Sequence, residues 1–231
     1  MGVKERRERE KSETRDKIVD AARELFVTEG YEGVSMRRVA DKIEYSPTAI
    51  YVHFADKNEL FRELCHRDYA RLAEVLQSSV ATADPIERLR RIGGTYVEFG
   101  IRYPNHYKFM FMTPHPGHEM DEVDRDMHGN PEKDAYAFLK WAVQQAIDAG
   151  RFREGVNDAE LISQTLWASV HGVISLQIAK GSDAWVDWRP IEDRAAMMLD
   201  ITLRGLLQTT GKPSSVAQDS TSQGPEKRRR K

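Results

Sequence analysis

Apolar residues recur at helical spacing along most of the chain. Between residues 14 and 29 they follow the i, i+3, i+4, i+7, i+8 pattern of a helix with one buried face, at Ile18, Ala21, Ala22, Leu25 and Phe26. Gly30 and Gly33 then end this helix. Alternation of apolar and polar residues long enough for a strand does not occur, so the pattern predicts an all-α fold.

The next segment predicts two short helices and the start of a third. Ser35 can cap the first, and Ser46 followed by Pro47 can begin the second, since proline fits the first helical position. Asp56 and Glu59 have the spacing of a reciprocal capping box for the third. The first two helices place apolar residues on one face each, at Met36, Val39, Ala40, Ile43, Ile50 and Phe54. Because helices of one or two turns do not stand alone in water, both need the preceding helix as a scaffold.

Two motifs with helix-turn-helix spacing lie within residues 28–60, TEGYEGVSMRRVADKIEYSPTAIYVHFADKNEL. They are G-[YF]-x-x-x-[ST] and S-x-x-x-x-Y-x-x-F, and through them the chain resembles the TetR family of bacterial transcriptional regulators. The resemblance implies a DNA-binding head, an all-helical body and a homodimer. Two residues depart from the family pattern: Glu44 stands in the turn where glycine is usual, and Tyr45 where a small aliphatic residue is common.

The second short helix, residues 46–54, is the predicted recognition helix in the major groove of DNA. Its first residues, Pro47, Thr48 and Ala49, are expected to meet base edges. The resemblance also implies contacts to DNA phosphates, which fix the register of the protein without reading sequence. The residues at these positions are Ser35, Arg37, Tyr51, His53 and Lys57.

The charge of the chain does not by itself indicate a nucleic-acid partner. The net charge is −2, and residues 1–57 contain twelve Lys and Arg against twelve Asp and Glu. A positive DNA-binding face must therefore come from the placement of single residues. Arg37, Arg38 and Lys57 are the candidates, because they lie at helix starts, where the helix dipole adds positive potential.

The rest of the chain predicts a larger helical body. Its 231 residues, 40% of them hydrophobic, are enough for a small head and a larger core, with about nine helices in all. Residues 113–131 are rich in Pro and Gly and predict a mobile loop. We expect a charged N-terminal arm (1–11), a head (12–57), an effector-binding and dimerisation body (58–208) and a disordered basic tail (209–231).

An effector site is expected in the body. The segment WASVHG, residues 167–172, resembles a Trp-x-x-x-His-Gly element in one branch of the family's C-terminal domains. Ligand cavities are mostly apolar with a few convergent polar groups, which favours a largely apolar small-molecule effector. The candidate residues are Tyr103, Tyr107, Phe109, Met110, Phe111, Trp167 and His171. The alternative is that they fill an ordinary core, as Met and aromatic residues commonly do.

The last two predicted helices have wide apolar faces, typical of an intermolecular four-helix bundle. The expected dimer contacts are Leu166, Val170, Val173, Ile174, Met198 and Thr202. Small residues near the same face, among them Gly172, would permit close approach of helices.

Other chemistry finds little support in the sequence. The single cysteine, Cys65, excludes an internal disulfide and suits the cytoplasm, and no apolar run is long enough to span a membrane. Cys65 and His66 are adjacent on a helix and point apart, so they do not form a catalytic pair. The residues of the Pro- and Gly-rich loop that invite a metal are His115, His118, Glu119 and His128. They lack helix-face ligand spacing, so we expect no metal, cofactor or enzyme activity.

These patterns together predict a homodimeric, ligand-responsive repressor on a palindromic DNA operator. Two-fold symmetry would place the recognition helices about 34–36 Å apart, one turn of B-DNA or a multiple. One alternative is a regulator without a ligand, which a sealed or absent cavity in the body would favour. Another is a helical enzyme with the head as a docking module, which would need a convergent nucleophile and base.

Overall fold

A computed structural model describes residues 2–78, 82–117 and 120–208, and this part of the chain is helical as predicted. It contains ten α-helices rather than about nine, and no strand beyond one isolated bridge between Phe152 and Leu207. The predicted basic tail, residues 209–231, lies outside the described residues.

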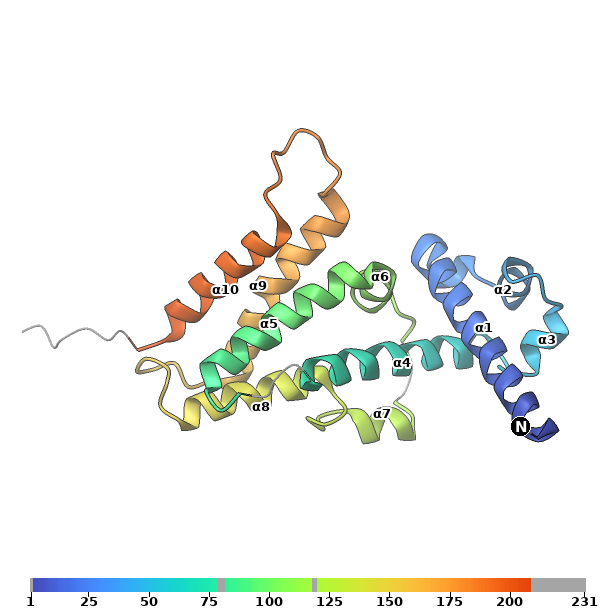
Figure 1. Cartoon of the computed structure of the whole chain (residues 1–231), viewed down its shortest axis with the longest axis horizontal. Coiled ribbons are helices and arrows are strands. Elements are labelled where there is room, and N and C mark those ends of the chain that lie inside the picture. The colour runs from blue at the N-terminus through green and yellow to red at the C-terminus, as the bar shows by residue number, and fades with distance from the viewer. Residues whose placement is uncertain (1, 79–81, 118–119, 209–231) are drawn as a thin grey trace, which may run out of the picture.

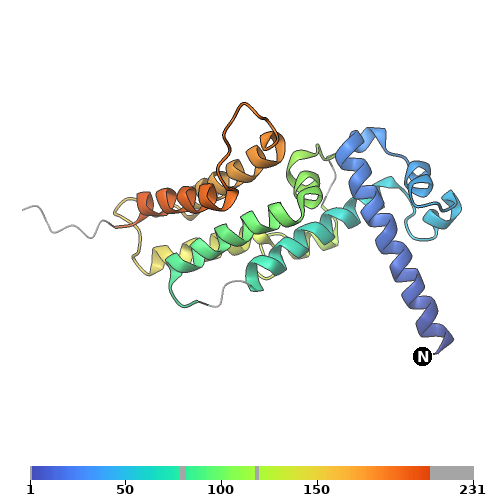
Figure 2. The same cartoon turned by 45° about the horizontal axis from the view of Figure 1, so that its top comes forward.

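The first three helices make up the head. Their bounds are α1 Val3–Gly33, α2 Met36–Lys42 and α3 Pro47–Tyr51. The first helix begins well before residue 14, where the apolar pattern starts, because ion pairs one turn apart support its exposed N-terminal part. These pairs are Lys4–Glu8, Arg6–Glu10 and Arg9–Glu13. This part of α1 therefore projects from the head as a helix (Figure 2).

The caps predicted for the short helices are confirmed, with one change. The Ser35 side chain accepts a hydrogen bond from the Arg38 amide, and that of Ser46 accepts one from the Ala49 amide. Asp56 accepts from the Glu59 amide at 2.8 Å, as a capping box requires. The Glu59 carboxylate, however, accepts from the amide of Ala55 and not from that of Asp56.

Seven helices follow the head (Figure 1). Their bounds are α4 Lys57–Ser78, α5 Pro85–Arg102, α6 Pro104–Met112, α7 Glu122–Met127, α8 Ala135–Asp148, α9 Ala159–Lys180 and α10 Ile191–Leu206. The fourth runs from the head into the body, where α5 packs between α4 and α8 on one side and α9 and α10 on the other. Near the head, α6 contacts α1, α4 and α5, so it lies where head and body meet.

Residues 113–131 are only partly the irregular loop that the sequence predicts. They include α7, which begins with a capping box in which Asp121 accepts from the Asp124 amide and the Asp124 carboxylate accepts from the Asp121 amide. The Pro- and Gly-rich composition around this box masked a helix of six residues, too short for a clear apolar repeat.

Glu44 has left-handed backbone geometry in the turn between α2 and α3. Its φ angle is 59°, and among the described residues no other non-glycine residue has a positive φ. The turn closes through hydrogen bonds from the amides of Glu44 and Tyr45 to the carbonyls of Asp41 and Ala40. The position therefore needs the geometry that glycine adopts freely, and a residue with a Cβ pays about 1 kcal/mol there.

We predict that Glu44→Gly stabilises the protein by about 1 kcal/mol relative to Glu44→Ala. Both variants lose the same exposed carboxylate, but only glycine removes the Cβ that disfavours a positive φ. Urea unfolding of the two variants measures the difference. Equal stabilities would contradict the argument from backbone geometry.

Candidate DNA-binding face and ligand cavity

The third helix is held in the head by one face and exposed on the other. Ile50 and Phe54 are fully buried, while Pro47, Thr48 and Tyr51 are exposed and Ala49 is half-buried. Tyr51 is 53% exposed although it is a large aromatic residue. The start of α3 thus presents the predicted base-contacting residues to solvent, with a tyrosine hydroxyl one turn further on.

The predicted phosphate-binding cations differ in how free they are. The Arg37 side chain is 82% exposed, 4.0 Å from Asp41. The guanidinium of Arg38 donates to Glu29 at 2.6 Å. The Lys57 ammonium donates to the carbonyl of Tyr31 and lies 4.0 Å from the centre of its ring. Arg38 and Lys57 thus stabilise the head itself, and Arg37 is the most open of the three.

His53 lies beside α1 rather than on the open face of α3. Its carbonyl accepts from Arg15, and its buried Nδ1 has no hydrogen-bond partner within the described part of the chain. Burial, with the nearby charges of Lys11 and Arg15, lowers the pKa of His53. The ring is therefore neutral at neutral pH and would meet a phosphate only as a neutral hydrogen-bond partner.

A buried ion pair joins α1, α4 and α6. The Arg23 guanidinium donates two hydrogen bonds to Asp68, both at 2.8 Å, and His106 Nδ1 lies 2.9 Å from the same carboxylate. Burial opposes the charge on Arg23, but its bonds to Asp68 outweigh this and raise its pKa. This cluster was not predicted from the sequence, although Asp68 occupies an apolar position of the repeat formed by Phe61, Leu64, Cys65 and Leu72. We call Arg23, Asp68 and His106 the junction cluster.

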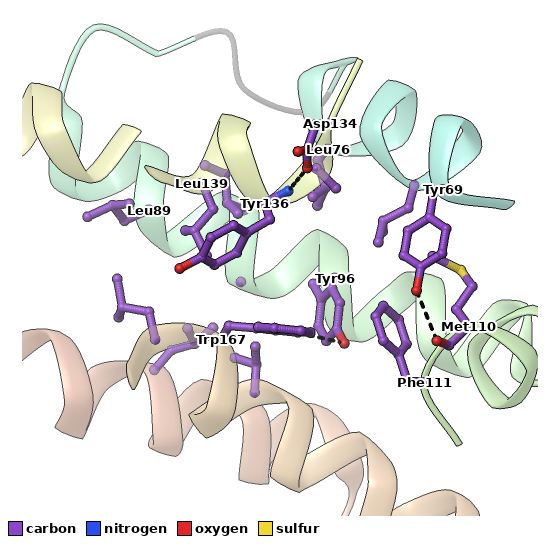
Figure 3. Close-up of a pocket in the computed structure, with 17 residues that line it drawn as sticks. Tyr69, Leu76, Leu89, Tyr96, Met110, Phe111, Asp134, Tyr136, Leu139 and Trp167 are labelled. Atoms are coloured by element: carbon purple, nitrogen blue, oxygen red, sulfur yellow. Dashed lines mark hydrogen bonds between the residues drawn. The ribbon is translucent and has the colours of Figure 1, made fainter. Parts of the chain in front are cut away.

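A cavity of about 340 Å³ lies in the body, between α4, α5, α6, α8, α9 and α10 (Figure 3). Five aromatic residues line it: Tyr69, Tyr96, Phe111, Tyr136 and Trp167. Most of the remaining lining is aliphatic, including Leu72, Leu76, Leu89, Ile92, Leu139, Leu166, Val170 and Leu199. Its volume is in the range of small-molecule sites in proteins.

Three of the seven predicted effector residues line this cavity: Met110, Phe111 and Trp167. Phe109 instead packs against Phe26 and Phe61 where head and body meet, and Tyr103 packs against Phe99 under the guanidinium of Arg71. The sequence analysis omitted the lining tyrosines of α4, α5 and α8, because an aromatic residue at a helical core position carries no mark that separates lining from filling.

Tyr107 and His171, the other two, form a hydrogen-bond network behind the cavity wall. The Tyr107 hydroxyl lies 2.7 Å from His171 Nδ1, and that of Tyr96 lies 3.0 Å from the same atom. Trp167 Nε1 donates to the Tyr96 hydroxyl at 3.1 Å. Burial lowers the pKa of His171 and raises that of Tyr96 to about 12, so both groups are uncharged at neutral pH.

The predicted dimer contacts need revision, because four of them are buried within their own chain. Leu166, Val170, Val173 and Ile174 are all buried in the core. The apolar face of α9 is wide, and the part of it that carries these residues packs on α5, α8 and α10. Met198 remains partly exposed and Thr202 half-buried. The apolar residues that these two helices expose most are Leu161, Leu176, Met197 and Ile201.

The side chains of His66, Asp121 and Asp124 are close enough to hold a metal ion. His66 Nε2 lies 2.9 Å from Asp124 and 3.9 Å from Asp121, so the three already form a hydrogen-bonded polar cluster between α4 and α7. The loop histidines that the sequence brought to attention do not join it. His115 bonds the Phe109 carbonyl, His128 is exposed, and His118 and Glu119 lie outside the described residues.

Two further predictions concern the reactivity of Cys65 and the presence of a membrane-spanning helix. Cys65 is buried, and burial raises the pKa of its thiol to about 12, which leaves it unreactive at neutral pH. None of the helices in the described ranges is both long and apolar enough to cross a membrane.

Comparison with known proteins places these features in a family. Residues 18–64 match the model for bacterial regulatory proteins of the tetR family, and residues 89–201 match the tetracyclin repressor-like C-terminal domain. The chain belongs to the TetR family. The two matches cover the second half of α1, the helices α2 and α3, and most of the body, including much of the cavity lining.

Curated relatives are similar to parts of the chain. Over 67 residues the chain is 43% identical to the HTH-type transcriptional repressor AcnR of Corynebacterium diphtheriae, an alignment that spans 29% of this chain and 35% of AcnR. The chain thus aligns with about a third of the length of this curated relative.

Solved structures share the fold over most of the chain. A protein of unknown function from Rhodococcus sp. RHA1 matches with a TM-score of 0.66 and 23% identity, over 84% of this TetR-family chain and 95% of its own. The SmeT–triclosan complex matches with a TM-score of 0.62 and 20% identity, over 90% and 99% of the two chains.

We predict that Asp68→Ala lowers the free energy of unfolding by about 3–5 kcal/mol, because it leaves the buried charge of Arg23 without its main partner. Asp20→Ala is the matched control, since Asp20 pairs with the same guanidinium but its side chain is 72% exposed. It should cost less than about 1 kcal/mol. Urea unfolding measures both, and similar losses would contradict the assigned role of Asp68.

Proposed function

We propose that this chain is a transcriptional repressor that binds a palindromic DNA operator as a homodimer and responds to a small-molecule ligand. The observation that carries the proposal is the exposed start of α3, where Pro47, Thr48 and Tyr51 are displayed on a well-capped scaffold. A helix presented in this way fits the major groove, where its N-terminal residues reach base edges. The family membership and the name of the AcnR relative support the same function.

A protein that binds DNA in this mode would act in the cytoplasm, and a palindromic operator would bind two copies of the head. The exposed apolar residues of α9 and α10 support a second copy of this chain as the partner, through a four-helix bundle. The contacts that we propose for this bundle are Leu161 and Leu176 on α9 and Met197 and Ile201 on α10, which are exposed in a single chain. Two-fold symmetry would then set the two recognition helices about 34–36 Å apart.

The cavity favours a regulator that is controlled by a ligand over a regulator that binds DNA constitutively. Its wall includes Tyr69, the neighbour of Asp68 on α4, and Met110 and Phe111 at the end of the helix that carries His106. A ligand would therefore touch the two helices that the junction cluster ties to α1. If it favours one arrangement of the heads by about 1–3 kcal/mol, DNA affinity changes about 5–150-fold.

Selection from a random duplex pool at near-physiological salt tests DNA recognition. We predict enrichment of a palindrome whose half-sites are about one helical turn apart, or a multiple of it. Failure to enrich any sequence, even at low salt, would contradict a sequence-reading head.

Two substitutions then test the assignment of contacts on the selected operator. Tyr51→Ala and Tyr51→Phe should both weaken binding to all duplexes by roughly tenfold, because a hydrogen bond to a phosphate is lost. Thr48→Ala should instead relax the preference at one base pair. Fluorescence anisotropy with operator and scrambled duplexes separates the two effects. Unchanged affinity and preference in all three variants would place the contacts elsewhere.

The dimer face is tested with Ile201→Glu, which puts a charge on the exposed apolar side of α10. We predict a monomer in sedimentation equilibrium and a loss of operator binding. Val123→Glu is the matched control, because Val123 is an exposed apolar residue on α7, away from this face. A dimer that survives Ile201→Glu would move the interface to another surface.

A further inference from the structure

We infer that the cavity is built for a largely apolar, uncharged ligand that donates a hydrogen bond, and against acids and ligands that only accept. The inference deepens the proposed function and rests on it, because it takes this cavity as the ligand site. It follows from how the polar groups of the wall are already bonded (Figure 3).

The donor hydrogens of the wall are bonded within the protein. The Tyr69 hydroxyl donates to the carbonyl of Met110 at 3.0 Å, and the Tyr136 hydroxyl donates to the carboxylate of Glu160. Trp167 Nε1 donates to the oxygen of Tyr96. A ligand in the cavity therefore meets these groups after their hydrogens have been committed.

The remaining hydroxyl, that of Tyr96, is committed through His171. Two hydroxyl groups converge on His171 Nδ1, so this nitrogen is the acceptor and the neutral ring carries its hydrogen on Nε2. Tyr107 also has two other acceptors, the Tyr96 oxygen and the His171 carbonyl 3.3 Å away, and donation to either leaves Nδ1 for the hydroxyl of Tyr96. The donor of Tyr96 thus points toward the network and away from the cavity.

Two of the tyrosine oxygens in the wall retain acceptor capacity. A phenol oxygen has two lone pairs, and the Tyr96 oxygen already accepts from Trp167 and is hydrogen-bonded to the Tyr107 hydroxyl, so the acceptors that remain are those of Tyr69 and Tyr136. The Tyr69 hydroxyl is described only as a donor, and the Tyr136 hydroxyl donates to Glu160 and accepts from Gln164, which leaves it one lone pair. The wall therefore offers acceptors, and a ligand hydroxyl or amide N–H can satisfy one of them. A ketone or ether oxygen finds every side-chain donor among the described lining residues already bonded, and it loses its bonds to water.

The charges at the wall disfavour an anion. The lining residues of the described chain include no Lys or Arg, and the only charged one is Asp134. Its carboxylate accepts from the amide of Tyr136 at the start of α8 and from the amide of Gly129 in the preceding turn. A carboxylate or phosphate on a ligand would be buried without a cation and near a like charge, which is costly.

Three biphenyl compounds test this inference, since they share one apolar body and differ at one end. These are 4-phenylphenol, which donates; 4-methoxybiphenyl, which only accepts; and biphenyl-4-carboxylate, which is an anion. Calorimetric titration of the full chain should show the phenol binding about fivefold or more tighter than the ether. The acid should bind weakest, by roughly tenfold or more relative to the ether.

Cavity-filling variants place the binding site. Val170→Phe extends a wall residue into the cavity and should abolish binding of the phenol, while Val123→Phe on α7 should leave it unchanged. If Val170→Phe does not fold, as judged by circular dichroism, Ala135→Phe fills the same cavity from α8. Equal or tighter binding of the ether or the acid would overturn the inference. So would absence of binding by all three compounds, or binding that survives filling of the cavity.

The outcome is separable from that of the proposed function. The titrations need no DNA, whereas operator binding is measured by anisotropy with and without 4-phenylphenol. Binding in the expected order without any change in DNA affinity would support the ligand class and contradict ligand-responsive repression. Normal operator binding with a preference for the acid would contradict the ligand class alone.

Discussion

The position of the head depends on one buried carboxylate. The Asp68 carboxylate accepts two hydrogen bonds from the Arg23 guanidinium of α1 and lies within hydrogen-bond distance of the His106 ring of α6. Three helices therefore meet at a single charged group. Two buried charges are tolerable only while each keeps its partner, which gives the junction cluster a narrow range of geometries. Small shifts of α4 or α6 must therefore be followed by α1. This is the property that a ligand-controlled head requires, because a loose junction would absorb the shift.

The two long helices α9 and α10 each have an inner face in the core and an outer face with exposed apolar residues. Their inner residues close the core and the cavity, with Leu166 and Val170 in its wall, while Leu176 and Ile201 face outward. A ligand in the cavity and a second copy of the chain would therefore lie on opposite sides of α9. This arrangement lets the spacing between two heads and the occupancy of the cavity influence each other through a single layer of helix.

The fold was largely predictable from the sequence because helix starts carry local signals. Ser35, Ser46 and Asp56 all cap helices as their positions indicate. The site was less predictable, since helical periodicity tells that a residue is buried but not against what. Val173 and Ile174 read equally well as dimer contacts and as core, and Phe109 reads as well for a cavity as for the junction. Asp68 did carry a signal, a charge within an apolar repeat, and it marks the group on which the junction depends.

The pairing of cations within the head affects how the protein is distributed between its operator and DNA of arbitrary sequence. Arg38 is bound to Glu29, Lys57 is bound to Tyr31, and residues 1–57 carry equal numbers of acidic and basic side chains. Attraction to DNA of arbitrary sequence comes from released counterions, and so it grows with the number of free cations. A repressor with this head would bind DNA of arbitrary sequence weakly, and only a small fraction of the repressor would be held at non-specific sites along the chromosome. Even a small number of copies could then keep an operator occupied.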